Sequence, residues 1–140
     1  MKRLQNGRSM IEMLGVLAII GVLSIGGLAG YTMAMNRYRA NNVLDYIARC
    51  GVVAQTAGMG EETYTNKACS ELLAGETAPS SLTAATVSGT SPKITIAATY
   101  SSDNVAQAVA TRSSADANGV KIKADGSTFC FANADGCTGS

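Results

Sequence analysis

Four cysteines are the residues of this 140-residue chain whose chemistry is most readily predicted: Cys50, Cys69, Cys130 and Cys137. An even number of cysteines behind an export segment is typical of two disulfides in an oxidising compartment. Free thiols in a reducing cytosol are one alternative. A zinc site is another, but the chain has no C-x-x-C pair to support it. We therefore predict that all four cysteines form disulfides.

The residues that most enzymes need are missing. The chain has no histidine, so it lacks the commonest general base and the usual activator of a Ser or Cys nucleophile. No phosphate-cradling motif is present, and a net charge of +1 creates no field for nucleic acid. We predict no catalytic residue, no metal, no cofactor and no nucleic-acid partner.

A lone carboxylate, Glu12, stands at the front of a long apolar run. No charged residue follows it from Met13 to Asn36. A charge inside hydrocarbon costs roughly 3 kcal/mol on insertion scales. Glu12 therefore either rests at a headgroup boundary or meets a specific partner.

The apolar run is long enough for a membrane anchor. As a helix, its 24 or so residues span roughly 36 Å, more than the hydrocarbon core of about 30 Å. A cleaved signal peptide, with a cut among the small residues from Ser24 to Gly30, is the alternative, but its apolar region would be shorter. The basic residues Lys2, Arg3 and Arg8 lie before the run, which predicts a cytoplasmic N-terminus.

Glycines recur within the anchor. Gly26 and Gly30 form a G-x-x-x-G pair, which permits close helix packing in lipid. Glycine is also simply commoner in membrane helices than in soluble ones. The pattern is thus open between helix packing or local unwinding and ordinary composition.

After the anchor the pattern becomes amphipathic. Small or apolar residues recur at helical spacing: Ala40, Val43, Ile47, Cys50, Ala54 and Ala57. Polar residues fall on another face: Arg37, Asn41, Asp45 and Arg49. Asp45 and Arg49 have the spacing of a favourable ion pair. This predicts one unbroken helix that continues to about Ala57, with its second half lying on a small sheet.

The segment 58–92 is predicted to hold a loop and a short helix. Asn66 is a candidate N-cap, and Gly75 a candidate stop. From Thr77 to Pro92 the composition of Ser, Thr, Gly and Pro is typical of a surface loop.

The segment 93–140 is predicted to form a C-terminal sheet. Lys93–Tyr100 has the pattern of a strand, while 103–112 is open between a helix capped by Asp103 and a strand. Asp125-Gly126 is a hairpin turn signal. On the strand that follows, Phe129 and Phe131 share one face, which should cover the helix.

These faces bear on the disulfide pairing, for which four cysteines allow three patterns. Cys50 lies on the buried face of the helix, whereas Cys130 should point away from that core. We therefore predict the pairs Cys50–Cys69 and Cys130–Cys137.

The N-terminal sequence G-RSMIE-MLGVLAIIGVLSIGG resembles the processing signal of type IV pilins and type II secretion pseudopilins. Gly7 matches the residue before the prepilin peptidase cut, and Glu12 the fifth residue after it. Gly21 and Tyr31 also match common family residues. The family usually has Phe, Leu and Pro where this chain has Arg8, Met10 and Ala29, respectively.

The resemblance implies an α+β, type IV pilin-like fold with three parts. Residues 1–7 are a leader, 8–36 an apolar transmembrane and filament-core helix, and 37–140 a globular head that begins with the amphipathic helix half, about 37–57. It further implies cleavage after Gly7, N-methylation of Arg8, and assembly through Glu12. The implied partners are prepilin peptidase, an inner-membrane platform protein with its ATPase, membrane lipid, and other copies of the subunit.

Two other functions stay open. A type II secretion pseudopilin often binds calcium near its C-terminus, and Asp116, Asp125 and Asp135 are available here, although turn chemistry also explains Asp125 and Asp135. A C-terminal disulfide loop is commoner in pilins. The other function is a single-pass periplasmic binding domain that never polymerises. The pilin prediction places the chain in the inner membrane first, and later in a surface or periplasmic filament.

Overall fold

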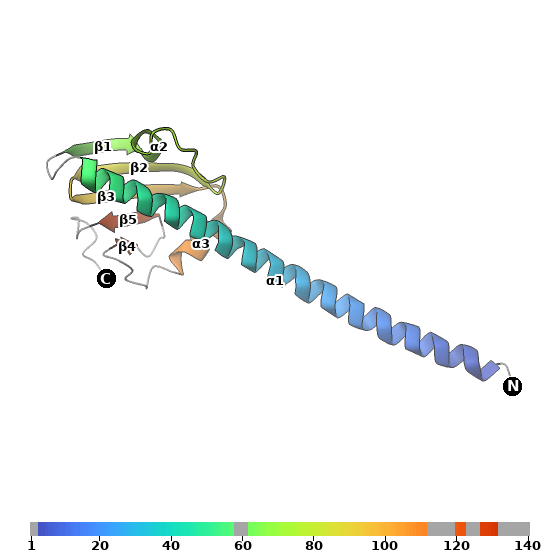
Figure 1. The fold of residues 1–140 in the computed structure, drawn as a ribbon. Helices are drawn as coiled ribbons and strands as arrows, with labels where there is room; N and C mark the ends of the chain where they lie inside the picture. Colours follow the sequence, from blue (N-terminus) through green and yellow to red (C-terminus); the bar gives the residue numbers. More distant parts are fainter. Residues whose placement is uncertain (1–2, 58–61, 112–119, 123–126, 132–140) are drawn as a thin grey trace. The chain divides into compact units, whose positions relative to one another are not determined.

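In the computed structural model, helix α1 runs from Arg3 to Ala57 without a break, which confirms the predicted continuous helix. The structure describes residues 3–57, 62–111, 120–122 and 127–131 (Figure 1), with only the backbone for 3–8 and 120–122. The chain divides into two compact units, residues 1–35 and 36–140, and α1 contributes to both.

The first unit consists of the N-terminal part of α1. Its Leu, Met and Ala residues favour the helix, and its glycines do not interrupt it. The hydroxyl of Ser24 donates to the carbonyl of Ile20 at 2.7 Å, and that of Thr32 to the carbonyl of Ala29 at 2.9 Å. These polar side chains are therefore satisfied within the helix and need no outside partner.

The second unit contains a five-stranded antiparallel sheet in the order β1-β2-β3-β5-β4. The strands are β1 (Thr63–Ala68), β2 (Leu82–Thr90), β3 (Lys93–Tyr100), β4 (Val120–Ile122) and β5 (Thr128–Phe131). Two short helices, α2 (Cys69–Leu72) and α3 (Asp103–Ala110), complete the described elements. A long N-terminal helix with a small antiparallel sheet confirms the predicted α+β arrangement.

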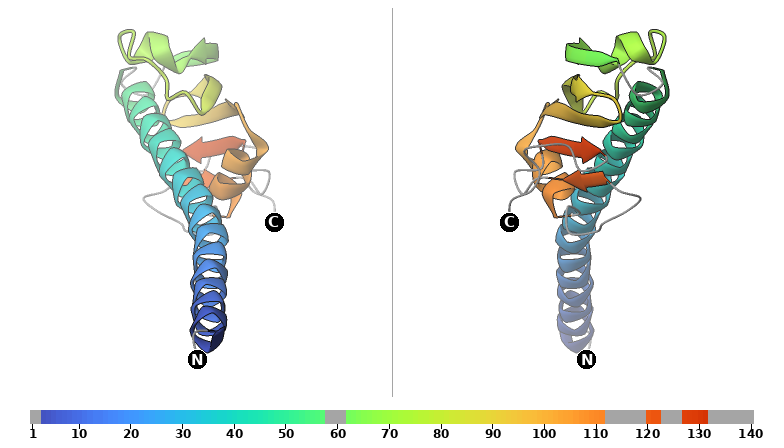
Figure 2. Two further views of the ribbon diagram at one scale, coloured as in Figure 1. Left: turned by 90° about the vertical axis from the view of Figure 1, so that its right-hand side faces the viewer. Right: turned by 90° about the vertical axis from the view of Figure 1, so that its left-hand side faces the viewer.

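The core of the second unit lies between the C-terminal part of α1 and the sheet, and both views of Figure 2 show this green part of the helix at one side of the strands. The predicted stripe on α1 is buried at Ala40, Val43, Ile47, Cys50 and Ala54, whereas Ala57 is exposed. The stripe faces a row of buried strand residues: Val87, Ile94, Ile96, Phe129 and Phe131. Burying one apolar stripe on one sheet face supplies the main favourable term for this fold.

Side chains from β1 and from the β2–β3 turn donate hydrogen bonds to carbonyls at the end of α1. The last four carbonyls of a helix have no partner within it. The Tyr64 hydroxyl donates to the carbonyl of Ala54 at 3.0 Å, and the Ser91 hydroxyl to the carbonyl of Gln55 at 2.9 Å. In return, the Gln55 amide donates to the carbonyl of Pro92 at 3.1 Å. These bonds tie the last turn of α1 to β1 and to the β2–β3 turn.

The prediction of a loop and short helix over 58–92 is wrong in two places, because β1 and β2 lie within it. Asn66 is not an N-cap. It lies in β1 with a φ of 49°, at a break in the register with β2, and Ala68 precedes the first residue of α2. Gly75 does follow α2 in the left-handed region, with a φ of 84°, and its N–H donates to the carbonyl of Ser70.

The predicted sheet over 93–140 contains a helix as well as strands. The strand Lys93–Tyr100 is confirmed. The ambiguous segment forms α3, in which Ser102 precedes the helix and Asp103 is its first residue, so Asp103 is not the cap. Val105 and Val109 of α3 enter the core. The pairing of β4 with β5 confirms the hairpin, while the turn at Asp125-Gly126 lies outside the described residues.

Gly51 of α1 lies against the ring of Phe131 on β5. A methyl group built on its Cα would overlap the ring of Phe131, which is 4 % exposed. Phe131 therefore faces the helix as predicted. The ring of Phe131 occupies the space that a side chain at position 51 would fill.

We predict that Gly51→Ala destabilises the second unit by roughly 1–2 kcal/mol, because overpacking of a filled core exceeds the gain of about 1 kcal/mol in helix propensity. Urea unfolding of the full chain in detergent micelles measures the change. Gly30→Ala is the matched control, since nothing lies within 4 Å of its added methyl. In a Phe131→Leu background the loss should disappear; an equal loss there would exclude the ring as the cause.

We also predict that stability falls in alkaline solution. Burial raises the pKa of the Tyr64 phenol, and the nearby Glu62 carboxylate raises it further. Because the unfolded phenol titrates near pH 10, this stabilisation is complete below about pH 10 and is lost as pH rises towards the folded-state pKa. Tyr64→Phe should be less stable at neutral pH by about 1 kcal/mol but lose less above pH 10 or so. If urea unfolding shows that the parent and Tyr64→Phe lose the same free energy of unfolding as the pH rises, the prediction is contradicted.

Candidate functional site

The surface of the first unit is apolar on every side. Side chains that point in different directions around the helix are all largely exposed, including Ile11 at 72 %, Val22 at 72 % and Ile25 at 76 %. By length and composition, the described helix from Ser9 onward can cross a membrane. A continuous apolar surface of this kind must be covered by lipid or by protein.

Glu12 is the only charged residue from Ser9 to Asn36, and its side chain is exposed. Within the described part of the chain it forms no ion pair or hydrogen bond. The hydroxyls of Ser24 and Thr32 are satisfied within the helix. Glu12 is thus the charged group in this stretch of the helix that a partner would have to satisfy.

The predicted processing site lies in the helical backbone one turn before Glu12. Gly7 and Arg8 are part of α1, and residues four apart, such as Arg8 and Glu12, fall on the same helix face. Cleavage after Gly7 would place the new amine about 6 Å along the helix axis from Glu12. The predicted cut thus lies in helical backbone about one turn before Glu12, while cleavage itself stays a prediction.

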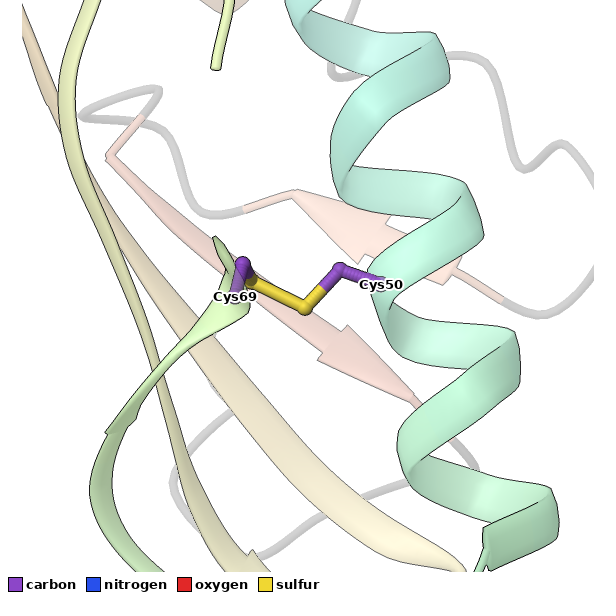
Figure 3. The surroundings of a disulfide bond; sticks show 2 residues. All are labelled: Cys50 and Cys69. Atoms are coloured by element: carbon purple, nitrogen blue, oxygen red, sulfur yellow. A yellow bond between two sulfur atoms is a disulfide. The ribbon is translucent and has the colours of Figure 1, made fainter. Parts of the chain in front are cut away.

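A disulfide in the second unit joins α1 to the start of α2. Cys50 and Cys69 are bonded, with their Cα atoms 5.6 Å apart (Figure 3). Both side chains are fully buried in the core. This confirms the predicted Cys50–Cys69 pair and the helix-to-helix tie that it makes.

An ion-pair cluster lies next to the disulfide on the outer side of α1. Arg49 contacts Asp45 at 3.2 Å, which confirms the predicted pair, and Glu76 at 2.6 Å. Sequence reasoning missed Glu76, because no local spacing connects it to Arg49 across 27 positions. Burial raises the pKa of the neighbouring Tyr46 phenol; Glu76 raises it further, while Arg49 lowers it. The disulfide and Arg49 together hold the segment around α2 against α1.

The second predicted disulfide is described in part. Cys130 on β5 is disulfide-bonded and buried. It does not belong to the core cluster that contains its neighbours Phe129 and Phe131, as the strand alternation predicted. Its predicted partner, Cys137, lies outside the described residues.

The acidic residues considered for calcium, Asp116, Asp125 and Asp135, also lie outside the described residues. Within the described part of the chain, no group of three or more His, Cys, Asp or Glu side chains could hold a metal ion. The proposal of a calcium site thus stays untested.

Comparison of the chain with protein-family models, curated proteins and solved structures found no match in any of the three.

We predict that replacing both Cys50 and Cys69 by alanine lowers the free energy of unfolding by about 3 kcal/mol, the chain-entropy value for a loop of this length. Urea unfolding in micelles measures the loss. Arg49→Gln is the local control and should cost less than about 1 kcal/mol, because its ion pairs are solvent-exposed. A double variant as stable as the parent would show that the disulfide does not hold the head together.

Proposed function

We propose that this chain is a structural subunit of a type IV pilus-like filament, anchored in the inner membrane before assembly. One observation carries the proposal. A helix that is apolar on every side carries a single carboxylate near its start, and the other end of the same helix forms the core of a separate folded unit. This arrangement suits a subunit whose helix moves from lipid into a bundle of copies.

The charge of Glu12 gives the proposed assembly its specificity. An isolated carboxylate near hydrocarbon is costly, while a buried pair of opposite charges is tolerable. Cleavage after Gly7 by prepilin peptidase creates a positive amine at Arg8, which the enzyme then methylates. In the filament, Glu12 of one subunit meets this amine on its neighbour. Glu12 then sets the register between copies.

The head supports an exported location for this subunit. A buried disulfide at Cys50 and a disulfide-bonded Cys130 fit the oxidising side of the inner membrane. A platform protein and its ATPase drive the subunit into the filament, whose heads face outward. We assign the chain no catalytic role. The predicted Cys130–Cys137 pair would close a C-terminal disulfide loop, which favours a pilus over a secretion pseudopilus because pilins commonly carry such a loop.

We predict that the mature protein lacks residues 1–7 and carries one methyl group on Arg8. Intact mass of the protein from membranes of cells with prepilin peptidase measures both changes. Gly7→Ala should leave the chain at full length, whereas Gly15→Ala, within the apolar run, is the control and should be processed normally. Full-length wild-type protein would favour the membrane-anchored domain that never polymerises.

The proposed function also predicts the effect of removing the charge of Glu12. Glu12→Gln removes the charge with little change in size, so the subunit should be processed and anchored but form few or no filaments. Electron microscopy of sheared filaments, with subunit counts in the membrane, measures the effect. Glu12→Asp, which keeps the charge, should retain part of the assembly. Filament yield at the wild-type level from Glu12→Gln would contradict the proposed role.

A further inference from the structure

A ring of two arginines and a tyrosine follows the apolar run directly. Arg37, Tyr38 and Arg39, here called the arginine collar, are all exposed, and Tyr38 exposes 61 % of its surface. Within the described residues neither arginine forms an ion pair or hydrogen bond. Ala40, the next residue, is the first one buried in the core. The collar is thus not used by the packing of the head.

The directions of the collar residues favour a partner that surrounds the helix. At about 100° per residue, Arg37 and Arg39 lie on nearly opposite sides of α1, with Tyr38 between them. A single protein partner docked on one side of an unassembled subunit would leave one arginine free. A layer of lipid headgroups presents phosphates on all sides at once.

The spacing along the helix also fits a headgroup layer. The apolar run from Met13 to Asn36 ends directly before Arg37. As a helix, its 24 or so residues correspond to roughly 36 Å, enough to cross a hydrocarbon core of about 30 Å. Arg37 therefore falls in the headgroup region that follows the core. A tyrosine at this level is typical of an interfacial anchor.

We propose that the arginine collar binds the phosphates of anionic phospholipids in the leaflet on the head side, and so holds the unassembled subunit at a fixed depth. This inference rests on the membrane-anchored state of the proposed function. Assembly then has to break these lipid contacts when the helix leaves the bilayer. Each arginine near an anionic surface changes the fraction of chains whose collar contacts the headgroups by about fivefold. Loss of both arginines should therefore lower that fraction by roughly 25-fold.

The chain has no tryptophan, so Tyr38→Trp introduces a single fluorescent probe into the full chain. The Tyr38→Trp chain is placed in vesicles of phosphatidylcholine, with or without phosphatidylglycerol, and quenched with neutral acrylamide. We expect phosphatidylglycerol to shield the indole, high salt to reverse the shielding, and added Arg37→Gln and Arg39→Gln to abolish it. Lys67→Gln with Lys93→Gln removes two charges from the sheet as the matched control and should keep the shielding.

The outcomes separate the collar from the proposed function. Two outcomes would overturn the collar proposal alone, provided that the chain resists alkaline extraction from the vesicles. One is equal quenching of the indole with and without phosphatidylglycerol. The other is a loss of shielding in the lysine control as large as the loss in the arginine variant. A wild-type chain that alkali extracts would overturn the membrane anchor and the collar together. If the arginine substitutions prevent filament formation but leave the shielding unchanged, the arginines bind a neighbouring subunit and the lipid proposal is wrong.

Discussion

The burial of one stripe of α1 against the sheet is the interaction on which the head depends. The stripe from Ala40 to Ala54 covers Val87, Ile94 and Ile96, and the buried disulfide adds a covalent tie at its middle. At its end, the hydroxyls of Tyr64 and Ser91 satisfy carbonyls that the helix leaves open. Gly51 lets Phe131 approach the same surface. A small domain gains its stability from such combined ties rather than from a large core.

The other part of the same helix has the opposite character. Nothing in the described residues of the first unit covers its apolar side chains, and the hydroxyls of Ser24 and Thr32 are satisfied within the helix. One helix therefore has two kinds of surface. In the head it has a polar face and a buried stripe, and in the segment that precedes the head its surface is apolar apart from Glu12. The proposed function uses this division, because lipid and a bundle of identical helices can each cover the apolar part. In the proposed function, the carboxylate of Glu12 distinguishes the lipid from the bundle.

The strands that sequence reasoning missed have a common physical feature. In β2 the register with β3 shifts between Leu82 and Ala84, so the buried residues Leu82, Ala85 and Val87 do not alternate regularly. In β1 a similar shift follows Tyr64, which is the only fully buried residue of that strand. A shifted register removes the two-residue period by which a strand is recognised. The Ser- and Thr-rich composition therefore predicted a loop. In the structure, pairing with the neighbouring strands holds the same residues in an extended conformation.

Local sequence patterns were enough to predict the long helix, its change from apolar to amphipathic, the strand Lys93–Tyr100, the β4–β5 hairpin and the Cys50–Cys69 pair. Each of these depends on periodicity or on the face of a single element, and such features are local. The three-dimensional structure was needed to establish that β1 and β2 are strands, that 103–110 is a helix, and that Glu76 meets Arg49. These depend on contacts between distant segments, where packing and hydrogen-bond partners override weak local preferences.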